Sequence, residues 1–227
     1  GVYRHEVIGD NAMMKYGFEK EYFLVTAWED GYCWSSEFNQ KCFRLCPDSV
    51  PKDECGYLAE ARGEPHENPV AAAYLMMADE HKVREKASLH GLSLLDSEPT
   101  VKLPRKLFRE ALRKYGKPGY SDQRHNMYGL DYSVNNSWNR AALHIHFSNT
   151  TEFYHKDENK NVFTKILHHP IDMCKYILAL DKAFAKEIKE SKRLPGFYEM
   201  KQHGFEYRSL PTSVDPIKVA EVIAGIK

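Results

Sequence analysis

Apolar and polar positions along the chain follow two periods, one typical of strands and one typical of helices. Runs rich in strand-forming residues predict four strands: residues 17–28, 57–62, 141–148 and 205–210. Capping residues, early prolines and apolar spacing predict four helices: residues 68–90, 102–115, 170–192 and 216–225. The strands and helices interleave without a regular βαβ order, so we predict an α+β fold with a mostly antiparallel sheet.

The size and charge of the chain narrow the class of protein. Its 227 residues are enough for a substantial core, and no repeat or linker divides them, so we predict one domain over residues 1–227. The 32 basic side chains equal the 32 acidic ones, so direct binding to nucleic acid or to a membrane surface is not expected. No apolar stretch approaches the ~20 residues of a membrane span, and no signal peptide is visible. We therefore expect a cytoplasmic protein.

Most of the cysteines lie in one short stretch. Of the five, four fall close together: Cys33, Cys42, Cys46 and Cys55. An odd number of cysteines without a signal peptide argues against a framework of disulfides. Four thiolates could hold zinc, but the paired Cys-x2-Cys spacing typical of such sites is missing. Scattered reduced thiols are the preferred interpretation, with a zinc site as the alternative.

Glu19 and Glu21 stand two residues apart in a run of strand-forming residues, so both carboxylates are expected on one face of a strand. Neighbouring anions repel each other, and burial removes their hydration. A divalent cation bound through oxygen ligands would offset both costs. The alternative is an edge strand with a solvated polar face, which is the commoner fate of glutamate in a strand.

Three further pairs repeat this spacing with other chemistry. His144 and His146 share one strand face, which suits metal ligation or phosphate contact, although two surface histidines would give the same pattern. The other two pairs combine an acid with a guanidinium: Glu206 with Arg208, and Glu60 with Arg62. Each could be a simple ion pair, or an acid that holds a cation beside an arginine that holds phosphate. On one sheet, the four pairs would form a wall suited to a nucleoside triphosphate bound through divalent ions.

The ordered set of these strands resembles the glutamine-synthetase superfamily. The Glu-x-Glu, His-x-His and Glu-x-Arg strands of that superfamily are matched, in the same chain order, by residues 19–24, 143–146 and 205–209. From about residue 15 to residue 226, the chain more closely resembles the carboxylate–amine ligases (amidoligases) encoded by tailed phages, and residues 60–66 and 193–211 also match. The resemblance implies a glutamine-synthetase-like catalytic fold, with a curved, mostly antiparallel sheet flanked by helices.

The resemblance also implies a reaction and its cofactors. Such enzymes use ATP with Mg²⁺ or Mn²⁺ to phosphorylate a carboxylate, and an amine then displaces phosphate to form an amide or isopeptide bond. The metal ligands implied by position are Glu19, Glu21, Glu60, His144 and Glu206. The residues implied to contact ATP, phosphate or the substrate carboxylate are His146, Arg62 and Arg208. Arg208 and Glu206 are the implied catalytic residues, and Arg208 would stabilise the phosphoryl group in transfer. The partners would be a small-molecule or peptide acid and an amine, with the oligomeric state left open.

The chain departs from glutamine synthetase in ways that leave parts of this assignment open. Glutamine synthetase has two further glutamates on its middle strands; Glu60 matches one, and Glu64 and Glu37 are rival candidates for the other. Residues 139–142 replace the glycine-rich approach to the His-x-His strand. Residues 122–128 are expected to form a loop over the substrate.

Three other functions remain compatible with the same residues. A metal-dependent hydrolase would use the histidines and carboxylates to activate a water, but it explains Arg208 less well. A guanidino kinase of the same broad fold would transfer phosphate without forming an amide. A non-catalytic phage accessory protein would bind nucleotide or metal without turnover, and the joint presence of the acidic, His and Arg pairs argues against it.

Overall fold

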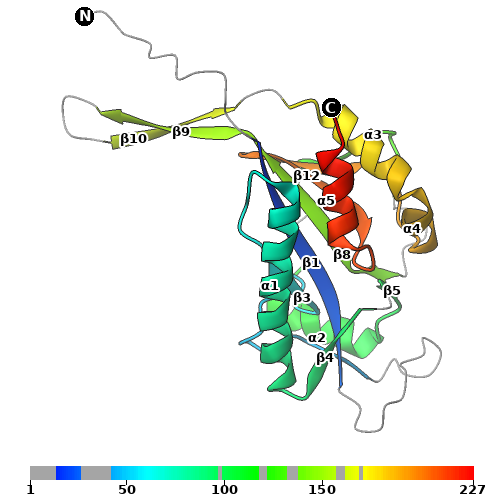
Figure 1. Cartoon of the computed structure of the whole chain (residues 1–227). Helices are drawn as coiled ribbons and strands as arrows, with labels where there is room; N and C mark the ends of the chain where they lie inside the picture. The colour runs from blue at the N-terminus through cyan, green and yellow to red at the C-terminus, as the bar shows by residue number, and fades with distance from the viewer. Residues whose placement is uncertain are drawn as a thin grey trace, which may run out of the picture.

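An eight-stranded sheet built around one long strand organises the protein (Figure 1). The computed structural model describes residues 14–26, 42–96, 99–117, 122–131, 138–156, 162–168 and 171–227. The strands of this sheet are β1 (Lys15–Thr26), β2 (Phe43–Arg44), β3 (Leu58–Arg62), β4 (Leu92–Leu95), β6 (Arg124–Asn126), β8 (Ala142–Ser148), β11 (Phe197–Lys201) and β12 (Gly204–Pro211). Two small two-stranded sheets pair β5 (Thr100–Val101) with β7 (Asn139–Arg140), and β9 (Thr150–Lys156) with β10 (Val162–His168).

Strand β1 lies at the centre because it pairs along both of its edges. It pairs with β8 and β4 along one edge and with β3 and β2 along the other. From β8 the sheet continues through β12 and β11 to β6. All of these pairings are antiparallel, so the predicted α+β class with a mostly antiparallel sheet is confirmed.

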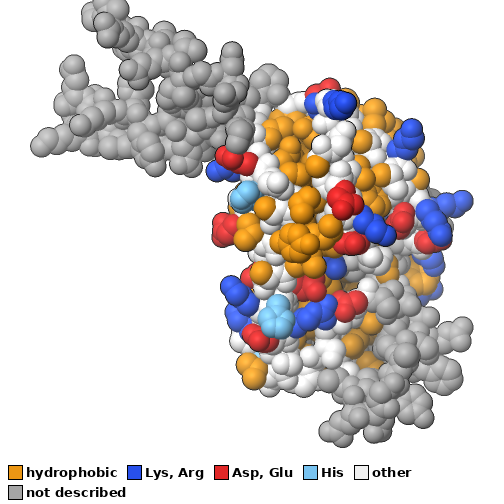
Figure 2. All heavy atoms as spheres, in the orientation of Figure 1, with side chains coloured by type: hydrophobic (Ala, Val, Ile, Leu, Met, Phe, Trp, Pro, Cys, Tyr) orange, Lys and Arg blue, Asp and Glu red, His pale blue; other side chains and the backbone are white. Residues whose placement is uncertain are grey.

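Helices cover one face of the sheet. Figure 1 shows four of them in front of it: α1 (Pro69–Ser88), α3 (Met173–Ala183), α4 (Ala185–Glu190) and α5 (Pro216–Ala224). Asn68 accepts hydrogen bonds from the backbone N–H groups at the start of α1, and Asp215 caps α5 in the same way, so both helices begin where a side chain satisfies free donors. Figure 2 shows this helical face, with apolar side chains along the helices and charged side chains scattered around them.

The two faces of β1 build two cores. Phe18, Tyr22 and Leu24 point toward the helical layer and are fully buried in the main core. Phe23 and Val25 point to the opposite face, where they pack into a second core. Helix α2 (Arg105–Tyr115) contributes its buried residue Leu107 to that second core. Glu19 and Glu21 share the face of Phe23 and Val25 but precede them along the strand, outside the second core.

A glycine brings the end of β3 against helix α1. A Cβ atom at Gly63 would lie 2.6 Å from the backbone nitrogen of Met76, which is closer than side-chain atoms tolerate. Because the contact is with backbone, the helix could not relieve it by a side-chain rotation. Gly63 therefore permits the close approach that seats β3, and with it Glu60 and Arg62, at a fixed height on the sheet.

The predicted elements mostly appear with shifted ends, and the differences have physical causes. The long helix predicted over residues 170–192 is wrong as a single helix, because Phe184 (φ −117°, ψ 26°) separates α3 from α4 while its ring is buried in the main core. Residues 122–128, expected as a loop over the substrate, instead contain β6, which pairs with β11. Strand β11 itself was not predicted, since its five residues lack a continuous apolar face and form a strand by pairing on both edges.

Of the helices that the structure describes, none combines the length and the apolar character that a membrane span requires.

Candidate functional site

The pairing register brings the predicted site residues of β1, β3 and β8 side by side. Glu19 lies opposite Arg62 of β3 on one edge and opposite His144 of β8 on the other. Glu21 lies opposite Glu60 of β3. Residues directly opposite each other in neighbouring strands project from the same face of a sheet, so these five side chains share one face.

The same face continues across the other half of the sheet. His146 of β8 lies opposite Glu206 of β12, which lies opposite Glu199 of β11, which lies opposite Arg124 of β6. The row of polar side chains thus crosses the sheet from β3 to β6 without a break. One pocket of about 590 Å³ opens on it. All eight residues predicted for the site line this pocket: Glu19, Glu21, Glu60, Arg62, His144, His146, Glu206 and Arg208.

Three side chains at the centre of the pocket could hold one metal ion. One donor atom from each of Glu19, His146 and Glu206 lies within 4.8 Å of the other two. Nε2 of His146 lies 3.2 Å from Oε1 of Glu19, yet it is buried and makes no hydrogen bond among the described residues. A buried imidazole nitrogen without a hydrogen bond, between two carboxylates, fits a cation ligand. The residues present therefore suit a divalent ion with nitrogen and oxygen ligands.

His144 lies between two of the carboxylates. Its Nδ1 atom lies 3.0 Å from Oε1 of Glu206 and 3.9 Å from Oε2 of Glu19, so it links the two carboxylates. Burial, together with the nearby Arg208 guanidinium, lowers the pKa of His144 to about 4. The imidazole is therefore neutral at pH 7. The resemblance implied a metal at His144 and phosphate at His146, and both roles stay predictions; the donor atoms close enough to share one ion belong to Glu19, His146 and Glu206.

Glu19 and Glu206 stay ionised in spite of their surroundings. Burial acts to raise the pKa of Glu206, but His144 and Arg208 outweigh it and bring the pKa to about 2. Burial opposes ionisation of Glu19 as well, and its contacts with His144 and His146 hold its pKa well below the ordinary value. Two ionised carboxylates beside neutral imidazole make an electron-rich site that attracts a cation.

Glu21 occupies a separate part of the pocket. Its Oε2 atom accepts a hydrogen bond of 2.8 Å from the backbone N–H of Ala142, and burial, with a contribution from Asp53, raises its pKa to about 8. Glu60 is also buried, which raises its pKa, and it pairs with the exposed Arg62 at the rim. The two carboxylates of the Glu-x-Glu strand thus have different neighbours. Glu19 lies with His146 and Glu206, and Glu21 lies beside Glu60.

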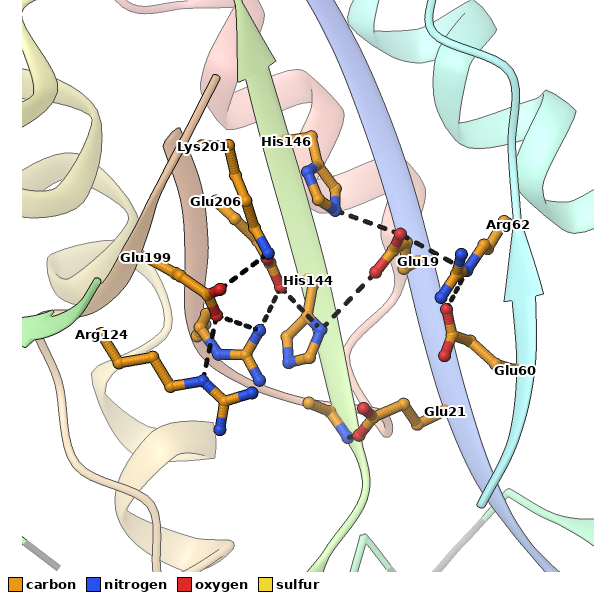
Figure 3. A network of polar contacts seen from close by, with 12 residues as sticks. Glu19, Glu21, Glu60, Arg62, Arg124, His144, His146, Glu199, Lys201 and Glu206 are labelled. Atoms are coloured by element: carbon orange, nitrogen blue, oxygen red, sulfur yellow. Dashed lines mark hydrogen bonds and ion pairs between the residues drawn. The ribbon is translucent and has the colours of Figure 1, made fainter. Parts of the chain in front are cut away.

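Two cationic side chains on the β6–β11–β12 side, Lys201 and Arg124, were missed from the sequence, and they form a cluster with the predicted Arg208 (Figure 3). Nζ of Lys201 lies 2.9 Å from Oε1 of Glu199 and 3.0 Å from Oε2 of Glu206. Arg208 contacts both of these glutamates, and Nε of Arg124 lies 3.0 Å from Oε2 of Glu199. Glu199 and Lys201 repeat the two-residue spacing of the other pairs, and this signal could have found them.

Arg193 binds the backbone of strand β12 next to this cluster. Its guanidinium donates hydrogen bonds of 3.0 Å to the carbonyl of Ser209 and 2.7 Å to the carbonyl of Arg208. These bonds fall where the pairing of β12 with β8 is irregular, between Tyr207 and Leu210. Arg193 therefore holds the stretch of backbone that carries Arg208, and it lines the pocket itself.

Three further acidic residues bear on the site. Glu64 is exposed and is not among the residues that line the pocket, and Glu37 lies outside the described residues, so the second middle-strand glutamate stays unassigned. Asp53 lines the pocket near Glu21 and is, like Glu199, an acid that the sequence did not single out.

The cysteine cluster divides between the two cores. Cys46 is buried in the main core, where burial raises the pKa of its thiol to about 12, and Cys42 and Cys55 are buried in the second core. Within the part of the chain that the structure describes, no cysteine belongs to a group that could hold a metal ion, and Cys33 lies outside that part.

No protein-family model matches the chain, and no match is found among curated proteins.

Proposed function

We propose that the protein is an ATP- and Mg²⁺- or Mn²⁺-dependent carboxylate–amine ligase of the glutamine-synthetase type, which releases ADP and phosphate. One observation carries the proposal: a carboxylate of the candidate metal group is itself in contact with the cluster of cationic side chains. Glu206 belongs to the group and also contacts Lys201 and Arg208. A divalent ion and several fixed cations around one space suit a polyphosphate, whose charge both can neutralise.

The described residues suggest where the metal would lie. Glu19, His146 and Glu206 would hold it, and a bound ion would neutralise phosphate charge during transfer. Glu21 and Glu60, directly opposite each other in the register, are the place for a second cation, as the resemblance implies. Their raised pKa values fit carboxyls that give up a proton when a cation enters.

The chemistry requires activation of an acid. A carboxylate does not exchange its oxygen for an amine, because the leaving group would be an oxide. Transfer of the terminal phosphoryl group of ATP to a carboxylate oxygen releases ADP and gives an acyl phosphate. The amine nitrogen then attacks the carbonyl carbon, the bond to the phosphate oxygen breaks, and the nitrogen loses a proton as the amide forms. Arg208, Lys201 and Arg124 are placed to stabilise charge on the transferring phosphoryl group.

The substrate classes remain broad. A pocket of about 590 Å³ can hold a nucleotide together with a small acid, and its openness to solvent leaves room for a peptide end. The partners are therefore a small-molecule or peptide carboxylate and an amine. We place the reaction in the cytoplasm, where ATP is at hand.

The test is product analysis with purified protein. We expect Mg²⁺-dependent formation of ADP and phosphate that requires both an acid and an amine, screened as pools of amino acids, polyamines and short peptides. Glu19→Gln and Arg208→Ala should abolish turnover, and the exposed Glu64→Gln should behave like the native protein. Formation of AMP and pyrophosphate would overturn the acyl-phosphate route, and full activity of Arg208→Ala would remove that residue from the mechanism.

A metal-dependent hydrolase is the second candidate, favoured by one observation. Three protein ligands of one ion leave further positions open, which is the arrangement of catalytic metals that activate water. Such an enzyme would cleave its substrate without ATP. Metal-dependent hydrolysis of ester or amide substrates in the absence of nucleotide, with no ADP formed in its presence, would favour this candidate over the ligase.

A further inference from the structure

His146 uses its two ring nitrogens in opposite directions. Nδ1 lies 3.1 Å from Nε2 of His203, while Nε2 faces Glu19 inside the candidate metal group. The centroids of the two imidazole rings lie 5.2 Å apart, and the ring planes make an angle of 45°. The rings are therefore tilted rather than stacked, and they meet through the nitrogen–nitrogen contact. The sequence did not single out His203, which lies in the turn between β11 and β12.

The backbone around His203 is held firmly. Its carbonyl accepts a hydrogen bond of 3.1 Å from the backbone N–H of Asn149, directly after β8. The next residue, Gly204, has φ +150°, and a Cβ atom there would lie 2.0 Å from the carbonyl oxygen of Phe147, so no other residue fits without a shift. These contacts fix the turn against the end of the strand that carries His146. The position of the His203 ring thus follows from the sheet itself.

The contact between the two histidines has two possible arrangements of the proton. A neutral imidazole carries one N–H and one lone pair. If His203 donates from its Nε2, His146 keeps its own proton on Nε2 and cannot bind a metal ion through that atom. If His146 donates from Nδ1, its Nε2 lone pair faces Glu19, and the two repel until a cation lies between them.

A metal ion in the candidate group requires the second arrangement. Nε2 lies 3.2 Å from Oε1 of Glu19, and among the described residues it makes no hydrogen bond. Nε2 binds an ion only through its lone pair, which leaves the ring proton on Nδ1, facing His203.

We propose that His203 is a positioning residue for a divalent metal: it accepts the Nδ1 proton of His146 and so presents the Nε2 lone pair to the ion between Glu19 and Glu206. The inference rests on the metal group of the proposed function and adds the residue that sets the tautomer and orientation of its imidazole ligand. His203 does not touch the metal or the substrate. It acts through His146 alone.

The experiment measures Mn²⁺ binding without nucleotide, by titration calorimetry, in the full-length chain. His203→Ala should weaken Mn²⁺ binding by about 10- to 100-fold, the usual effect of losing a hydrogen-bond partner of a ligating histidine. His203→Gln keeps an acceptor oxygen and should restore most of the affinity. His203→Phe keeps a ring without an acceptor and should bind as weakly as His203→Ala. Thermal unfolding of all three variants checks that each is folded.

A second readout reports the tautomer directly. Nitrogen-15 NMR of the histidine rings should show His146 as the Nδ1–H tautomer in the native protein, and a mixture or the Nε2–H tautomer in His203→Phe. Unchanged Mn²⁺ affinity in His203→Ala and His203→Phe, absence of Mn²⁺ binding to the native protein, or an Nε2–H tautomer of native His146 would each overturn the inference. The ligase proposal fails separately, if Mn²⁺ binds as expected but no acid and amine pair supports ADP formation.

Discussion

One face of strand β1 carries two different regions within a few residues. Phe23 and Val25 are covered by α2 and its neighbours and form a dry second core. Glu19 and Glu21, on the same face and the same strand, are left at an open pocket. Both pairs lie on one continuous strand, so the difference comes from the side chains around them. Apolar side chains surround Phe23 and Val25, which we call the covered half of the face. Histidine, arginine and lysine side chains surround Glu19 and Glu21, which we call the open half. A strand can thus be a structural support along part of its length and a ligand platform along the rest.

The charged side chains around the open half determine the pKa values of its glutamates. Glu206, although buried, is in contact with His144, Lys201 and Arg208, and its pKa falls to about 2. For Glu21, burial and Asp53 outweigh the influence of Arg208 and Arg193, and the pKa shifts in the opposite direction, to about 8. The open half therefore has two parts. Glu19 and Glu206, near β8 and β12, are ionised, whereas Glu21, near β3, holds its proton more strongly. This difference would separate the two cation positions of the proposed function.

The largest expected effect comes from the covered half. Phe23→Ala removes a fully buried ring from the second core and should lower the free energy of unfolding by about 3–5 kcal/mol, because the cavity it leaves cannot collapse completely. Urea denaturation measures this change. Phe23→Leu, with a smaller loss of volume, should remain folded and bind Mn²⁺ as the native protein does. A large loss of Mn²⁺ affinity in folded Phe23→Leu would show that the two halves are not independent.

Glu206→Gln, in the open half, should reduce activity while leaving the fold intact. Turnover should fall by about 100-fold or more, since the change removes a proposed metal ligand and a carboxylate that orders Arg208. The protein should stay folded, because Glu199 still contacts Lys201 and Arg208. Steady-state kinetics and urea denaturation of the same preparation test both parts. Glu64→Gln is the matched control outside the pocket, and equal activity of the two variants would contradict the site.

Gly63→Ala tests the close contact between the end of β3 and helix α1. Its new Cβ would meet the backbone of α1 at Met76, so we expect a destabilisation of about 1–3 kcal/mol, typical of overpacking. Gly225→Ala adds the same methyl group at a helix end where its nearest contacts are 3.5 Å or longer, and it should be neutral within a few tenths of a kcal/mol. Chemical denaturation of both variants makes the comparison. Equal stability of the two would refute the close approach.

The smallest effect concerns the other face of β1, where Glu80 of α1 contacts Lys20 and Tyr22. Burial alone would raise the pKa of Glu80, but these partners, with Arg84, lower it below its ordinary value. An acid with a lowered pKa in the folded state adds stability above the unfolded pKa, and that stability is lost as the pH falls through the folded value. Glu80→Gln should therefore lose less stability than the native protein between pH 5 and pH 3, by less than about 1 kcal/mol. Thermal unfolding at a series of pH values measures the difference, and identical pH profiles would contradict it.

Much of the site could be predicted from the two-residue spacing in strands. That spacing requires only local backbone geometry, so Glu19 with Glu21, His144 with His146, and Glu206 with Arg208 could be placed on shared faces before the sheet was known. Glu199 and Lys201 obey the same rule, but their strand is short and has no continuous apolar face. Strand β11 exists because β12 and β6 pair with both of its edges, and pairing across the sheet leaves no trace in a short segment of sequence.

By itself, the sequence determined which side chains share a strand face, where α1 and α5 begin, and that the fold mixes helices with an antiparallel sheet. These properties follow from the alternation of side chains along a strand and from capping residues beside a helix, which act over a few residues. Only the tertiary structure decided which histidine joins Glu19 and Glu206 in the candidate metal group, which glutamate is ionised, and that His203 contacts His146. Those outcomes depend on the register between strands that lie far apart in the chain and on burial, both of which are set when the whole sheet packs against its helices.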